Sequence, residues 1–116
     1  MLKAGTAARR RTYTWEPARP AAEARQQIEA LLHTIDRLLQ ERNSAWVGHV
    51  KILIGSGAEA AYGSITTAAD QPRWSGTLAA PIRQAELTIY AAIYTLTDAQ
   101  VAAAVDEALD TADLPF

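Results

Sequence analysis

The stretch VKILIGSGAEA, residues 50–60, decides how the middle of this chain folds. Aliphatic residues lead into Gly55-Ser56-Gly57, and Ala60 completes G-x-G-x-x-A, a permitted form of the dinucleotide-binding fingerprint. That fingerprint requires a helix directly after the glycines, because the pyrophosphate binds at the helix N-terminus. The residues that follow, AEAAYGSITTAAD, include Gly63 and the β-branched run 65–67, which are poor helix formers. We therefore predict a two-stranded hairpin here rather than a nucleotide site.

Alternating residues predict further strands on both sides of this turn. The segments that alternate are RTYTWEP (11–17), WVGHVKILIG (46–55), AAYGSITTA (60–68) and AELTIYAAIYTL (85–96). In the second of these, Val50, Ile52 and Ile54 share one face, whereas His49, Lys51 and Leu53 share the other. In the last, Tyr90 and Tyr94 lie on the face opposite the aliphatic residues.

Two segments carry apolar residues at helical spacing. The first spans about 20–42, with Pro20 suited to its first turn. The second spans about 98–111 and begins with a capping box, in which Thr97 is the N-cap and Gln100 the third helical residue. Leu96 can pack against Val101 as a hydrophobic staple.

The resulting order, β-α-β-β-β-α, predicts a ferredoxin-like two-layer α+β sandwich. We expect an antiparallel sheet of about four strands with two helices on one face. Residues 68–77, AADQPRWSGT, are rich in turn formers and are predicted to be a loop insert. The sheet face without helices would expose Tyr90 and Tyr94 and is a candidate partner surface.

Length and charge limit the organisation of the chain. Its 116 residues suggest a single domain over 11–116, preceded by a basic N-terminal arm over 1–10. The arm contains the cations Lys3, Arg9 and Arg10 and is followed by Arg11. The C-terminal segment contains acids instead, namely Asp98, Asp106, Glu107, Asp110 and Asp113. Two interpretations stay open: a solvated tail and helix face, or a pairing of the two ends within a chain or between subunits.

Composition argues against several classes of function. The net charge of −2 argues against nucleic-acid binding, and no stretch approaches the roughly 18 apolar residues of a membrane span. The absence of cysteine excludes thiolate metal sites and fits a reducing cytoplasm.

Few residues are candidates for chemistry. His33 lies beside the apolar stripe of the first helix and is interpreted as structural. His49 is polar within a strand, and a role as metal ligand or acid–base group is the alternative to a structural one. Arg73 and Trp74 lie in the predicted insert, where an exposed aromatic would favour binding. We identify no catalytic, cofactor-binding or metal-binding residues, since neither a Walker A loop nor G-x-S-x-G is present.

Three segments together carry a resemblance to a known family: WVGHVKILI (46–54), AAYGSITTA (60–68) and AELTIYAAIYTLTDAQVAAAVDEAL (85–109). In order and spacing they resemble the C-terminal accessory domain of CobW-type, cobalamin-synthesis-like GTPases. His49 and Lys51 fall in the family-like G-H-V-K segment. The GTPase domain and its cysteine metal motif are missing from this sequence. The resemblance therefore implies a detached accessory module that works beside a separately encoded metal-handling GTPase.

We expect a non-catalytic interaction module rather than an enzyme, with no cofactor, acting in the cytoplasm. Its expected partners are a second copy, in a dimer through the open sheet face, or the GTPase. The residues expected to contact a ligand or partner are His49, Lys51, Arg73, Trp74, Tyr90 and Tyr94. The alternative is a small-molecule-binding or small enzymatic domain, with a pocket beside the 68–77 insert formed by His49, Arg73 and Trp74.

Overall fold

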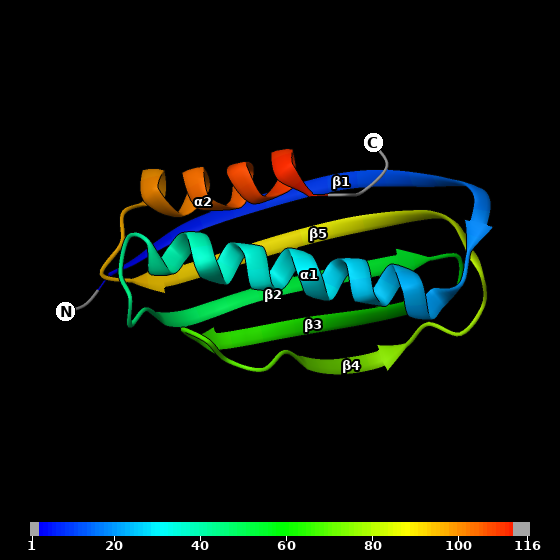
Figure 1. Cartoon of the computed structure of the whole chain (residues 1–116), viewed down its shortest axis with the longest axis horizontal. Coiled ribbons are helices and arrows are strands. Elements are labelled where there is room, and N and C mark those ends of the chain that lie inside the picture. The colour runs from blue at the N-terminus through cyan, green and yellow to red at the C-terminus, as the bar shows by residue number, and fades with distance from the viewer. Residues whose placement is uncertain (1–2, 113–116) are drawn as a thin grey trace.

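A computed structural model describes residues 3–112 as one sheet with two helices on the same face (Figure 1). The elements are β1 (Ala4–Arg19), α1 (Ala21–Gln40), β2 (Val47–Ser56), β3 (Glu59–Thr67), β4 (Arg73–Thr77), β5 (Ile82–Tyr94) and α2 (Asp98–Thr111). The strand order is β1-β5-β2-β3-β4, and every neighbouring pair is antiparallel. The predicted ferredoxin-like two-layer sandwich is confirmed, with five strands in place of four.

The additional strand forms inside the predicted insert. β4 pairs with β3 from Ala60↔Thr77 to Ser64↔Arg73, so the prediction of a loop over 68–77 is wrong for its second half. The strand has no alternating apolar pattern that sequence reasoning could detect. It forms because the outer edge of β3 offers unpaired backbone groups and because Trp74 packs toward α1.

The first strand begins much earlier than predicted. β1 pairs with β5 from Ala4↔Tyr94 onward, so most of the predicted basic arm is strand. β5 is 13 residues long and provides an edge along which this basic segment can pair. β1 and β2 both run antiparallel to β5, which lies between them, so α1 connects two parallel strands across the helix-covered face.

The glycine-rich stretch is a tight hairpin, as predicted. β2 and β3 pair up to Ser56↔Glu59, which leaves Gly57 and Ala58 as the two-residue turn. Gly57 has φ +61, as expected for glycine at the first central position of a type II′ turn. A strand follows the glycines in place of a helix, so the requirement of the dinucleotide fingerprint is not met.

The core lies between the sheet and the helices. It combines the apolar stripe of α1 with the inward residues of β2 and β5 and the alanine-rich face of α2. Its largest members are Trp15, Trp46, Tyr13, Ile28, Leu31, Leu32, Ile35, Leu39, Ile52, Ile54, Ile65 and Ile82. The capping box of α2 is present, because the Thr97 side chain accepts from the Gln100 N–H at 3.1 Å and Gln100 Oε1 accepts from the Thr97 N–H at 2.9 Å.

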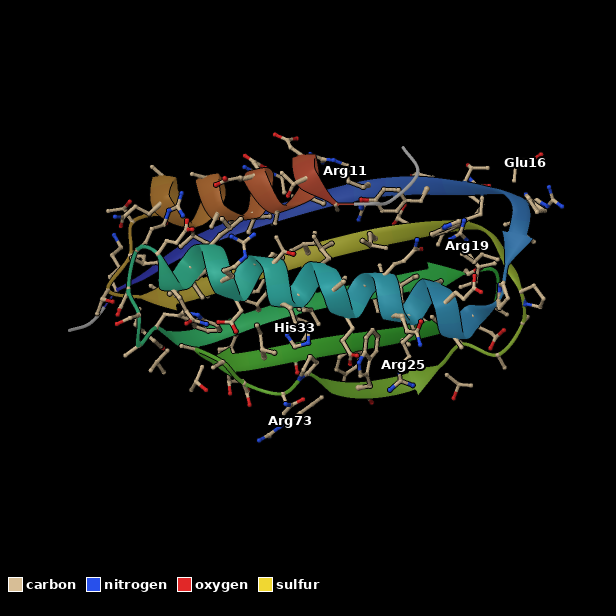
Figure 2. The ribbon with its side chains drawn as sticks, viewed as in Figure 1. Arg11, Glu16, Arg19, Arg25, His33 and Arg73 are labelled. Carbon is tan, nitrogen blue, oxygen red and sulfur yellow. The ribbon has the colours of Figure 1, made fainter. Side chains whose placement is uncertain are left out.

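The two oppositely charged ends of the chain meet within one molecule. The Arg9 guanidinium on β1 donates two hydrogen bonds to the Asp106 carboxylate on α2, at 2.7 and 3.0 Å. Figure 2 shows the neighbouring Arg11 in the same region, where β1 runs beneath α2. The pairing interpretation is thereby confirmed for Arg9 and Asp106, whereas Asp113 lies outside the described residues.

Candidate interaction surface

The sheet face opposite the helices holds the large apolar side chains that remain exposed. Among the described residues these are Val47, Leu53, Tyr62, Tyr90 and Tyr94. All five alternate with buried residues of their strands, and therefore point away from the helix layer. Tyr90, 47% exposed, is near the middle of this face. Exposed apolar side chains gathered on one face are typical of an interaction site.

The strand register arranges this face in rows that cross the whole sheet. One row contains Ala8, Tyr90, Lys51, Ser64 and Arg73, each directly opposite the next. The adjacent row contains Arg10, Thr88, Leu53, Tyr62 and Ser75. Neighbouring strands lie about 4.8 Å apart, and rows on one face lie about 7 Å apart.

Within these two rows, cations and tyrosines alternate from strand to strand. We call this set the alternating band: Arg10 on β1, Tyr90 on β5, Lys51 on β2, Tyr62 on β3 and Arg73 on β4. The Lys51 ammonium lies 4.9 Å from the centre of the Tyr62 ring, a cation–π contact. The band therefore combines exposed aromatic surface with positive charge.

Acidic groups lie beside the band rather than in it. Glu86 belongs to the following row, and its carboxylate is 3.6 Å from Arg10. Asp70 precedes β4, and its pKa is lowered, first because its carboxylate accepts from the Thr66 N–H and also because of the positive charge of Arg73. None of the ten residues in the two rows is acidic, so the centre of the open face is positive on a chain of net charge −2.

The structure places five of the six predicted contact residues on the open face. His49, Lys51, Arg73, Tyr90 and Tyr94 all point away from the helices. The face also includes Arg10, Leu53 and Tyr62, which the predicted contact set omits. Alternation already places Leu53 beside Lys51, whereas Arg10 falls in the region predicted to be an arm.

Trp74 lies on the opposite side of the sheet, against α1. Its Nε1–H donates to Glu29 Oε1 at 3.0 Å, and the Arg25 guanidinium lies 4.7 Å from its ring centre. Figure 2 shows Arg25 extending from α1 toward β4, while Arg73 points outward from that strand. The structure therefore does not bring His49, Arg73 and Trp74 together in one pocket.

A separate groove lies in the helix layer. Its volume is about 490 Å³, and its lining includes Arg19, Glu23, Gln26, Gln27, Leu31 and Thr111. His33 is exposed on α1 (Figure 2). Within residues 3–112, no group of three His, Cys, Asp or Glu side chains is placed to hold a metal ion.

Comparisons of this chain with protein-family models, with curated proteins and with solved structures find no match. Neither α1 nor α2 is long and apolar enough to cross a membrane.

Proposed function

We propose that this chain is a non-catalytic interaction module that binds a partner protein in the cytoplasm through its open sheet face. The observation that carries the proposal is the position of the large exposed hydrophobic side chains, which within residues 3–112 all lie on this face. The cations of the alternating band lie among them.

The size of the face suits this role. Five strands at about 4.8 Å spacing span roughly 24 Å, and the eight paired residues of β2 and β5 extend about 26 Å along the strands, so the flat area is at most about 600 Å². An interface of that size on each partner is at the lower end of specific protein–protein interfaces. The resemblance of the G-H-V-K segment and its neighbours to CobW-type accessory domains supports a metal-handling GTPase as the partner.

A second copy of the chain is the other candidate occupant, because a two-fold dimer could bury the same face on both subunits. Light scattering over a range of salt concentrations measures this directly. A dimer that dissociates on Tyr90→Ser would assign the face to self-association.

The alternative function is small-molecule binding. Its candidate site is the groove in the helix layer, rather than a pocket beside the 68–77 insert. The volume of this groove lies within the range of ligand sites. A thermal-shift screen tests it, since a ligand at 100 times its Kd adds about 2.7 kcal/mol of stability. If no compound shifts the melting temperature, this alternative fails.

The direct test of the interaction module is comparative purification of the tagged chain from its native cell. We expect the partner bound by the wild type to be lost from a Tyr62→Ser/Tyr90→Ser variant. A matched His33→Ser/Ala103→Ser variant, changed in the helix layer, should retain it. Partners that remain on the first variant and disappear from the second would refute the proposal.

A further inference from the structure

We propose that the occupant of the open face is an acidic amphipathic helix of the partner protein, lying across the strands along the alternating band. This inference rests on the proposed function and names the chemistry of the partner. It follows from the charge of the band and from the spacing of its side chains.

The charge of the band selects an acidic partner. Arg10, Lys51 and Arg73 lie in two adjacent rows that contain no acid, and Lys51 lies on the central strand β2. A second copy would bring three more cations to the same surface, and like charges in apposition disfavour binding. A single-stranded nucleic acid would meet only three cations, whereas proteins that bind such strands present a continuous basic groove.

The spacing of the band selects a helix. Its cations occupy every second strand, and the tyrosines occupy the strands between them. Lys51 and Arg73 share a row and lie about 10 Å apart, whereas Arg10 is in the adjacent row, about 12 Å from Lys51. Seven residues of an α-helix rise about 10.5 Å and return to nearly the same face. Acids at positions i, i+7 and i+14 can therefore meet Arg10, Lys51 and Arg73. Apolar residues three or four positions after the first and second acids then contact Tyr90 and Tyr62.

An extended segment fits this spacing less well. Three residues of a strand also cover about 10 Å, but they place successive contacts on opposite faces. The two helices of the chain do not present the required surface either. The large apolar residues of α1 and α2 are buried against the sheet, and the outward positions of α2 are alanines and polar or acidic residues. Neither α1 nor α2 can therefore be the occupant.

The test uses a synthetic helical peptide of three heptads as the probe, built on alanine and glutamine. It carries glutamate at every seventh position and leucine midway between the glutamates, and a matched peptide carries lysine in place of glutamate. Fluorescence anisotropy of the labelled peptides measures Kd. We expect the acidic peptide to bind the full chain, more weakly as salt rises, and the lysine peptide not to bind.

Two charge reversals locate the binding. Lys51→Glu and Arg73→Glu should each weaken the binding of the acidic peptide about tenfold. Arg37→Glu, an exposed cation of α1 in the other layer, should change it less than about twofold. Circular dichroism verifies that each variant is folded.

Three binding results would overturn the inference. The first is equal affinity for the two peptides, and the second is no binding of the acidic peptide. The third is an oligothymidylate of 15 residues that binds more tightly than the acidic peptide and depends on Lys51. Dimerisation that requires Tyr90 and excludes the peptide would also overturn it, while leaving the interaction module intact. In this comparison the module itself fails if the partner recovered from the native cell is insensitive to Tyr62 and Tyr90.

Discussion

Among the described residues, Asp36 is the only charged residue that is buried. Its hydrogen bonds hold three segments of the chain together. It is 5% exposed and lies on α1. Its carboxylate accepts hydrogen bonds from Trp46 Nε1 at 2.9 Å, from the Ala69 N–H at 3.0 Å and from Gln40 Nε2 at 2.9 Å. These bonds tie the helix to the start of β2 and to the β3–β4 connection, where Ala69 has φ +59. A buried carboxylate is tolerated because its oxygens are satisfied in this way.

We predict that Asp36→Ala lowers the free energy of unfolding by about 2–4 kcal/mol, because it leaves buried donors unpaired. Asp36→Asn should cost less, since the amide oxygen can still accept from Trp46. Urea denaturation measures both, with Asp110→Ala on the exposed face of α2 as the control. An Asp36→Ala protein as stable as the control would show that this network is dispensable.

Gly48 illustrates a second requirement at a single position. The β2–β3 register shifts between Val47 and Val50, and a Cβ on Gly48 would lie 2.1 Å from the Ala92 carbonyl oxygen. Gly48→Ala should therefore force β2 away from β5 and cost about 1–3 kcal/mol. Gly55→Ala is the matched control, because nothing lies within 4 Å of its added carbon. Equal unfolding free energies for the two variants would contradict this explanation of the glycine in G-H-V-K.

At the scale of elements, the Arg9–Asp106 pair fastens α2 to β1. The hydrogen bonds from Arg9, and then its positive charge, lower the pKa of Asp106 below its ordinary value. The pair therefore contributes stability above the unfolded pKa of about 3.9. That contribution is lost as the pH falls through the lowered pKa of the folded state. Both side chains are partly exposed, so the contribution is below about 1 kcal/mol.

The corresponding prediction concerns the difference in unfolding free energy between wild type and Asp106→Asn. That difference should be largest near pH 7 and should shrink toward zero as the pH falls through the lowered pKa of Asp106. Urea titrations at several pH values measure it, with Asp110→Asn as a control for the loss of an exposed carboxylate on the same helix. A difference that stays constant with pH would mean that the pair does not stabilise the fold.

The elements differ in how far local sequence determines them. α2 could be predicted in full because its capping box and apolar stripe are local signals. β4 could not, because RWSGT acquires its strand conformation from the edge of β3 and from the contact of Trp74 with α1. The basic segment before Arg11 reads as a solvated arm, yet it pairs with β5, a partner far along the sequence.

The candidate site was predictable in part for the same reason. Alternation assigns His49, Lys51, Tyr90 and Tyr94 to the polar faces of their strands without knowledge of the fold. It cannot show that β5 lies between β1 and β2, because strand pairing is non-local. The alternating band exists only once the register sets Arg10, Tyr90 and Lys51 on neighbouring strands. Trp74 was assigned to the wrong surface because its strand was interpreted as a loop.

At the scale of the whole molecule, the sheet has two faces with different surroundings. The helix-covered side contains the core, the buried Asp36 and the ion pair between the ends, and it maintains the fold. The open side contributes little to the core yet keeps tyrosines and cations in register across all five strands. We infer that the open side is the one that meets a partner.

The most direct test of this claim is photo-crosslinking in the native cell. A photoreactive phenylalanine derivative replaces Tyr90 on the open face in one strain, and Ala103 on the outer face of α2 in another. We predict a crosslinked adduct from position 90 and none from position 103. Adducts from position 103 alone, or from neither position, would contradict the assignment of the open face as the interaction surface.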